Sequence, residues 1–251
     1  MAADLPKSAR RRKRSAAARL RRFWIATVAL AIAASAGGFA LASWPGFYPH
    51  ATAVVGNRVV SAADILKHAA IASHRNVWLQ NTARMDARIE TIPYILSAAV
   101  RRSLPANVTV VVQEREPFAT LVSPQGHAVV DSALRVLASG DASPSLPIIV
   151  VRTAQPLTPG SFVTDPAVLR LRDDALALAR ANVVTRELRY DRFGELAIVL
   201  RNGIDVKLGG PRNFAAKIAL IDPIVAQVSR SHRPIAALDL RAPTTPVVVY
   251  K

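Results

Sequence analysis

The sequence predicts an α+β protein with a single transmembrane helix, then a β-α-α-β-β unit, then a mostly antiparallel β region with two helices. Three observations lead to this prediction. Residues 23–44 are apolar, and no Asp, Glu, Lys or Arg occurs between Arg22 and Arg58. Residues 51–114 carry strand, helix, helix, strand and strand patterns in that order. The remaining residues are rich in strand patterns, and two pairs of neighbouring strands are each joined by a hairpin turn.

The first element is an expected membrane anchor over residues 23–44, with the sequence FWIATVALAIAASAGGFALASW. As a helix, this segment rises about 33 Å, which is enough to cross the hydrocarbon core of a bilayer. The residues expected to carry the anchor are Phe23, Trp24, Leu30, Gly37, Phe39 and Trp44. The alternative is a signal peptide cleaved near Ala34-Ser35-Ala36. The apolar run continues past that site to an aromatic end, which favours an uncleaved anchor.

A basic tail, residues 1–22, precedes the anchor and carries nine Lys or Arg and one Asp. It supplies half of the formal net charge of +16. Because basic residues beside a span remain cytoplasmic, we expect a type II protein with its C-terminal part outside the membrane. The basic run 10–14 could bind nucleic acid by charge, but no aromatic residue interleaves it to stack on bases. We therefore expect contact with membrane lipid and no nucleic-acid partner.

Residues 51–114 read as one compact unit. Residues 51–55 form an expected strand that turns at Gly56-Asn57 and continues through 58–60. A helix opens at Ser61 with a capping box, and a second helix runs from Thr82 to Ile92, where Pro93 stops it. Residues 95–102 and 107–114 then alternate as strands.

The rest of the chain is predicted to be β-rich, with a helix at 165–181 capped by Asp165 and another at 213–228. The strands expected from alternation and turn residues cover 118–122, 127–131, 146–151, 183–190, 195–200, 204–208, 236–241 and 247–250. The turn at 201–203 contains Asn-Gly, which favours a tight hairpin.

Short motifs along this order resemble the bacterial cell division family FtsQ, called DivIB in Gram-positive bacteria. In the first unit they are Val55-Gly56-Asn57, Ile92-Pro93, the segment 98–102, Leu104-Pro105 and the segment 110–117. Further on they are Leu200-x-Asn-Gly, Leu208-Gly, Lys217 and Leu238-Asp-Leu-Arg241. The resemblance implies a POTRA domain over residues 47–116 and an FtsQ-type β domain over residues 117–251.

The resemblance also implies a function. It suggests a divisome scaffold in the inner or plasma membrane at the division septum, linking early and late division proteins to septal peptidoglycan synthesis. The implied partners are FtsB-like and FtsL-like bitopic proteins, with FtsW- or FtsI-like septal synthases and FtsK as further candidates. Two other classes remain open: a POTRA-containing transport or secretion component of the cell envelope, and a cleaved, secreted enzyme.

The expected partner site is the end of the chain. A strand that is last in the sequence often lies at a sheet edge, where another chain can add a strand, but it can also be buried. The residues alone leave both readings open, and the resemblance favours the edge. The expected partner-binding residues are Val247, Val248, Val249, Tyr250, Arg241, Phe214 and Lys217.

The sequence carries no constellation that points to catalysis. The five histidines are scattered, and no Gly-x-Ser-x-Gly or Ser-x-x-Lys motif is present. We therefore expect no enzyme activity, no catalytic residue, no metal or other cofactor and no small-molecule substrate. Because the chain has no cysteine, its outer part must be held by an apolar core rather than by disulfides.

Overall fold

The computed structural model describes residues 7–140, 145–230 and 234–251. Its contacts divide the chain into two compact units, which are treated separately below. The first takes its residues from 1–55, 62–86 and 99–111, and the second from 56–61, 87–98 and 112–251. The units group residues by contact, whereas the domain boundary expected after residue 116 follows the order of elements and stays a prediction.

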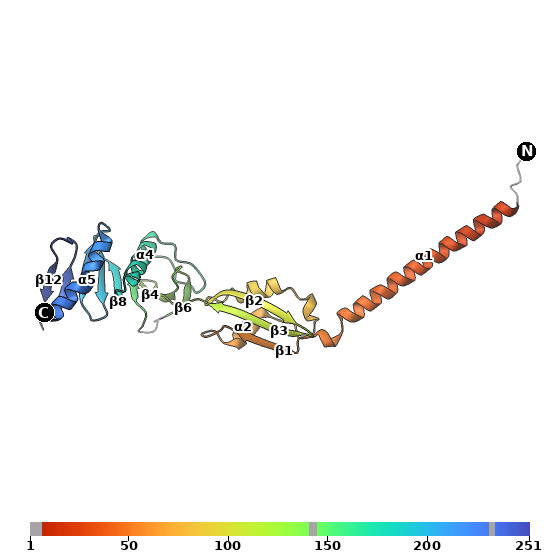
Figure 1. The fold of residues 1–251 in the computed structure, drawn as a ribbon, viewed down its shortest axis with the longest axis horizontal. Coiled ribbons are helices and arrows are strands. Elements are labelled where there is room, and N and C mark those ends of the chain that lie inside the picture. Colours follow the sequence, from red (N-terminus) through yellow and green to blue (C-terminus); the bar gives the residue numbers. More distant parts are fainter. Residues whose placement is uncertain (1–6, 141–144, 231–233) are drawn as a thin grey trace, which may run out of the picture. The chain divides into compact units, whose positions relative to one another are not determined.

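The elements up to residue 114 are one long helix, four short helical segments and three strands (Figure 1). In order they are α1 (Lys7–Ala42), η1 (Pro45–Phe47), β1 (Ala51–Val55), α2 (Ala62–Ala69), η2 (Val77–Leu79), α3 (Thr82–Ile89), β2 (Ile95–Ser103) and β3 (Asn107–Glu114). The strands form a sheet in the order β1-β3-β2, in which β1 runs parallel to β3. The β-α-α-β-β order expected from the sequence is confirmed. Helix α3 ends three residues earlier than expected.

Helix α1 contains the expected anchor but differs from it at both ends. The helix begins at Lys7, within the basic tail, and ends at Ala42, so Trp44 lies beyond it in the turn before η1. Its segment Arg19–Ala42, with a mean hydropathy of 2.0, is the one helix among the described residues that is long and apolar enough to cross a membrane. A signal sequence would share this property.

Residues 58–60 do not continue β1, so that part of the expected strand is wrong. The carboxylate of Glu114 accepts hydrogen bonds from the backbone N–H groups of Val59 at 2.8 Å and Val60 at 2.9 Å. These donors are therefore unavailable to a strand ladder. The chain enters this turn at Gly56, with a φ of +95°, where a Cβ would lie 2.1 Å from the carbonyl oxygen of Val112.

The elements after residue 114 are nine strands and two helices. In order they are β4 (Ala119–Ser123), β5 (Gly126–Val130), β6 (Val136–Ser139), β7 (Ile148–Val150), α4 (Pro166–Arg180), β8 (Thr185–Tyr190), β9 (Leu196–Leu200), β10 (Asp205–Gly209), α5 (Phe214–Ser229), β11 (Ile235–Asp239) and β12 (Val247–Tyr250). Asp165 caps α4 as expected, accepting a hydrogen bond from the N–H of Ala167 at 2.8 Å. Strand β6 was not predicted.

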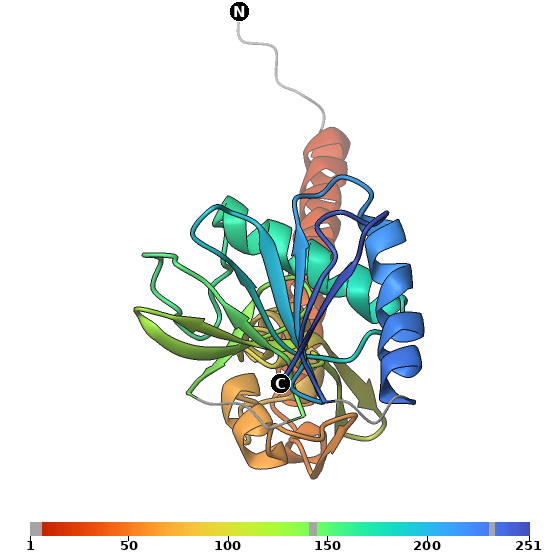
Figure 2. The ribbon, with the colours of Figure 1, turned by 90° about the vertical axis from the view of Figure 1, so that its left-hand side faces the viewer.

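The nine strands form one sheet in the order β12-β11-β10-β9-β8-β7-β4-β5-β6. Five of the eight neighbouring pairs are antiparallel and three are parallel, which confirms the mostly antiparallel fold class. Helix α4 connects the parallel strands β7 and β8, and α5 connects the parallel strands β10 and β11. Both crossovers step in the same direction along the sheet, so right-handed connections place both helices on one face (Figure 2).

The core lies between this face of the sheet and the two helices. The strands contribute a cross-strand row of buried side chains, and the helices contribute their apolar stripes. The row consists of Leu121, Ile149, Leu188, Ile198, Val206 and Leu238, and the stripes include Val168, Leu171, Leu178, Ile218 and Ile221. The opposite face of the sheet carries no helix from the described residues.

Candidate functional site

The candidate site is the sheet edge formed by β12. This strand pairs with β11 in antiparallel register, Val247 opposite Asp239 and Tyr250 opposite Ile235. It ends the order of the nine-stranded sheet, and no strand lies beside its outer side among the described residues. The sequence left open whether this strand is buried or lies at an edge, and the structure places it at an edge.

The side chains of β12 alternate between the two faces of the sheet. Val248 packs in part against the core, on the face that carries the helices. Val247 and Val249 point to the other face, where their side chains are 56% and 49% exposed. A strand added outside β12 would therefore meet two exposed valines, Val247 and Val249, on the open face and the half-buried Val248 on the other face.

Arg241, an expected partner residue, lies just after β11 and is held by acidic neighbours. Its guanidinium contacts the carboxylate of Asp239 at 2.7 Å and that of Glu195 at 3.6 Å. The hydrogen bond from Arg241 holds the pKa of Asp239 below its usual value, and the same bond raises the pKa of Arg241. Gly209 leaves room for this side chain, because a Cβ there would lie 2.8 Å from Cγ of Arg241.

Lys217 does not lie on an accessible surface, which corrects its assignment as a partner contact. Lys217 is only 3% exposed. Its Nζ donates hydrogen bonds to the carbonyl oxygens of Leu208 at 2.7 Å and Gly210 at 2.9 Å, so it ties α5 to the end of β10. The sequence held a signal for this burial, since Lys217 lies one helical turn before Ile221 on the apolar stripe of α5.

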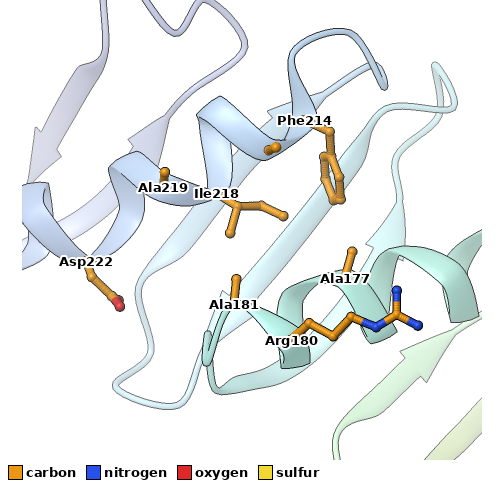
Figure 3. Close-up of a pocket in the computed structure, with 8 residues that line it drawn as sticks. Ala177, Arg180, Ala181, Phe214, Ile218, Ala219 and Asp222 are labelled. Atoms are coloured by element: carbon orange, nitrogen blue, oxygen red, sulfur yellow. The ribbon is translucent and has the colours of Figure 1, made fainter.

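Phe214 begins α5 and lines a groove between α4 and α5 (Figure 3). The groove has a volume of about 410 Å³, and its lining is mainly Ala and Ile side chains with Phe214. Arg180 and Asp222 supply its charged groups. Phe214 is therefore part of the packing between the two helices and lies apart from the outer side of β12.

In the described part of the chain, no group of three or more His, Cys, Asp or Glu side chains could hold a metal ion. The most perturbed tyrosine is Tyr190, whose hydroxyl donates to Asp174 Oδ2 at 2.9 Å. Burial, and then this hydrogen bond, raise the pKa of Tyr190 to about 12. Burial also raises the pKa of Asp174. The pair joins β8 to α4, and the adjacent Asp173 pairs instead with Arg172.

The opposite edge of the sheet, β6, is covered. The N–H of Val136 donates to Ser161 at 2.9 Å, and its carbonyl accepts from the N–H of Gly160 at 2.8 Å. The turn before β6 is fixed by Asp131, whose carboxylate accepts hydrogen bonds from the N–H groups of Ala133 and Arg135. The same carboxylate forms a buried ion pair with Arg115 at 2.8 Å. Sequence reasoning missed this cluster because Arg115 lies sixteen residues before Asp131, its ion-pair partner.

The chain is similar in sequence to known cell division proteins. The family model described as POTRA domain, FtsQ-type, matches residues 51–115. The cell division protein FtsQ of Myxococcus fulvus is 26% identical over 187 residues, which cover 69% of this chain and 64% of that protein. FtsQ of Neisseria meningitidis is 29% identical over 137 residues, covering 54% of this chain and 53% of that protein. This chain thus spans between half and two thirds of the length of these relatives.

Two further comparisons involve DivIB. The cell division protein DivIB of Clostridium acetobutylicum is 23% identical over 78 residues, or 31% of either chain. The solved extracytoplasmic domain of DivIB from Geobacillus stearothermophilus is 18% identical and matches over 97% of its length and 47% of this chain. Its TM-score is 0.30.

Proposed function

We propose, from the premise that this chain belongs to the FtsQ/DivIB family of cell division proteins, that it is a membrane-anchored scaffold of the division machinery. Its work is binding rather than catalysis. Helix α1 anchors it in the inner or plasma membrane at the septum, with the basic tail in the cytoplasm and the rest outside. It binds FtsB-like and FtsL-like proteins and so links early and late division proteins to septal peptidoglycan synthesis.

The proposed mechanism is addition of a partner strand along β12. The observation that carries it is that no strand lies outside β12 among the described residues, whereas the other edge of the sheet is bonded at Val136 of β6 to residues 160 and 161. An uncovered edge is a template for main-chain hydrogen bonds from an extended segment. We take the occupant to be an extended segment of an FtsB-like protein.

The two faces of β12 set what the added strand should look like. Side chains beside Val247 and Val249 would cover exposed valines on the open face, so apolar residues are expected there. On that same face Asp239 and Arg241 already form an ion pair near the strand. A partner side chain of either charge would have to compete with this pair, so an apolar alternation with few charges fits best.

The direct test is truncation of the full chain after Arg241, which removes β12. Partner binding is measured by co-purification of the membrane-extracted proteins with an FtsB-like protein from the same cell. The proposal expects binding to be lost while helical and strand content, measured by circular dichroism, is largely retained. Undiminished co-purification would show that β12 is not the partner surface.

A second test addresses division itself. A fluorescently tagged copy should form a band at mid-cell, whereas a transport component would label the cell rim uniformly. The truncated chain should retain its membrane location, since α1 is intact, and lose any mid-cell enrichment that depends on the partner. A uniform rim for the full chain would contradict the division role.

A further inference from the structure

A cluster of exposed apolar and basic side chains lies in the first unit, on η2, on the loop before it and on the turn between β2 and β3. The cluster, called the base surface here, consists of Arg75, Trp78, Leu79 and Leu104. Leu79 is 67% exposed, Leu104 is 76% exposed, and Trp78 is also exposed. Single exposed leucines are ordinary on protein surfaces, but a tryptophan and two leucines on neighbouring loops form a patch.

The two loops that carry the base surface are held against each other. The indole N–H of Trp78 donates to the carbonyl oxygen of Pro105 at 3.0 Å, next to Leu104. The guanidinium of Arg102 lies 5.4 Å from the centre of the Trp78 ring and donates to the carbonyl oxygens of Val77 and Trp78 at 3.0 Å. The leucines of both loops therefore belong to one surface.

The loop before Trp78 is also fixed by hydrogen bonds. The side chain of Gln80 bonds both the N–H and the carbonyl of Ala72 at 2.9 Å, and also the carbonyl of Arg75 at 3.0 Å. The carboxamide of Asn76 accepts from the N–H of Trp78 at 2.9 Å. These hydrogen bonds fix the loop, so the side chains of Trp78 and Leu79 are held in their exposed positions.

The chain between α1 and this surface is short and internally bonded. The N–H of His50 donates to the carbonyl of Ala106 at 3.3 Å, beside Leu104 and Pro105. Seven residues separate Ala42, the last residue of α1, from His50, so His50 lies within about 29 Å of the helix end. The hydroxyl of Tyr48 donates to the carbonyl of Ser43, and its ring contacts that of His74, which shortens the connection further.

We propose that the base surface docks on the bilayer surface beside the outer end of α1. The proposal rests on the proposed anchoring of α1 in the membrane. Tryptophan and leucine side chains next to arginines match the interface of an anionic bilayer, where the rings and leucines enter the headgroup region and the guanidinium groups meet lipid phosphates. The connection from α1 brings the surface to that interface with no further partner needed.

The test uses the three tryptophans of the chain, Trp24, Trp44 and Trp78. The full-length Trp24→Phe/Trp44→Phe variant, in which Trp78 is the remaining tryptophan, is reconstituted into vesicles of phosphatidylglycerol and phosphatidylcholine. Brominated acyl chains then quench tryptophans that enter the interface. The proposal expects a blue shift of Trp78 emission and its quenching by the brominated lipid. Emission that is the same in brominated and ordinary vesicles would overturn it.

Two single-tryptophan controls bracket this result. Trp44, studied in the Trp24→Phe/Trp78→Phe variant, should be quenched because it follows the end of α1. An exposed aromatic of the second unit, studied as Phe193→Trp with all three native tryptophans changed to Phe, should not be quenched. Equal quenching at position 193 would show nonspecific adsorption and overturn the proposal. An unquenched Trp44 would overturn the anchoring on which the proposal rests.

Substitutions within the base surface separate its apolar and basic parts. Leu79→Ser/Leu104→Ser should abolish Trp78 quenching without changing the circular dichroism spectrum, because both side chains are exposed. Arg75→Gln should lower the ratio of docked to undocked protein by about fivefold. The matched variant Arg186→Gln, exposed in the second unit, should leave quenching unchanged.

Equal loss of Trp78 quenching in the arginine variant of the base surface and in its second-unit control would overturn the proposed site. No division partner is present in the vesicles, so loss of strand addition at β12 would leave every one of these readings unchanged. The converse also holds, because co-purification after truncation at Arg241 does not depend on Trp78. Failure of the docking proposal is therefore distinguishable from failure of the proposed function.

Discussion

The outermost strands of the nine-stranded sheet, β6 and β12, are both short, yet they are treated differently by the rest of the chain. Strand β6 bonds to residues 160 and 161 on its outer side, and an isolated bridge joins Arg135 to Phe162. Strand β12 has no such cover among the described residues, and its valines on the open face are exposed.

The difference indicates that the chain itself satisfies hydrogen-bonding groups at the β6 edge, whereas those at the β12 edge are available to another chain. At the β6 edge Asp131 forms a buried ion pair with Arg115 and accepts two backbone hydrogen bonds, which together fix one turn. At the β12 edge Arg241 and Asp239 form an ion pair beside the strand, and no strand from the described residues lies on the outer side of β12. Exposed sheet edges are normally protected, so a bare one points to a partner.

Asp131→Ala should have the largest effect, because it breaks the covered edge. Arg115 would remain buried without its carboxylate, and two N–H groups would lose their acceptor. The free energy of unfolding should fall by about 3–5 kcal/mol in urea denaturation. The control, Asp173→Ala, removes a carboxylate that is 64% exposed and pairs with Arg172, and it should cost at most about 1 kcal/mol. A similar loss for both variants would contradict the assigned role of Asp131.

Lys217→Met should have the next largest effect, because it leaves two carbonyl oxygens without their donor. The free energy of unfolding should fall by about 1–3 kcal/mol. Lys207→Met, on an exposed position of β10, is the control and should change stability by less than about 0.5 kcal/mol. If Lys217 contacted the partner instead, Lys217→Met would lower partner affinity without lowering stability.

Val247→Lys tests the β12 edge as a partner surface while keeping the strand itself. A lysine on this strand should disfavour strand addition and weaken binding of an FtsB-like protein by about tenfold, or about 1.4 kcal/mol. Val184→Lys is the matched control, because Val184 and Val247 are each 56% exposed. Affinity is measured by titration of the detergent-solubilised partners. Equal loss of affinity in both variants would argue against the β12 edge.

A small pH effect should also mark the β12 edge. The hydrogen bond from Arg241 holds the pKa of Asp239 below its usual value of 3.8. Its stabilising contribution is therefore complete above about pH 3.8 and is lost as pH falls through the lowered pKa of the folded state. Urea denaturation between pH 5 and 2 should show a shallower acid loss for Asp239→Asn than for the native chain. Identical slopes would remove this ion pair from the account.

Most elements could be predicted from the sequence because their signals are local. Apolar periodicity located α4 and α5, the cap at Asp165 fixed the start of α4, and the Asn-Gly turn fixed the β9–β10 hairpin. The elements that were missed depend on distant residues. Strand β6 is short and gains its outer bonds from residues 160–161, and residues 58–60 leave β1 because Glu114, more than fifty positions away, takes their N–H groups.

The same distinction applies to the site. The sequence and its family resemblance pointed to the last strand, but could not show that β12 lies at the edge of the sheet, because strand order depends on the crossovers through α4 and α5. Lys217 was assigned as a partner contact through the family resemblance, whereas the structure buries it on the carbonyls of Leu208 and Gly210. The base surface was also missed, because Trp78 and Leu104 lie more than twenty residues apart in the chain and are brought together only by the fold.

Hydrogen–deuterium exchange at the amides of residues 247–250 tests the central claim most directly. The full chain in nanodiscs is compared with and without an FtsB-like protein at saturating concentration. The account predicts that exchange within β12 slows by at least about tenfold on binding, while exchange in β6 is unchanged. Unchanged exchange in β12 while the partner is demonstrably bound would contradict strand addition at this edge.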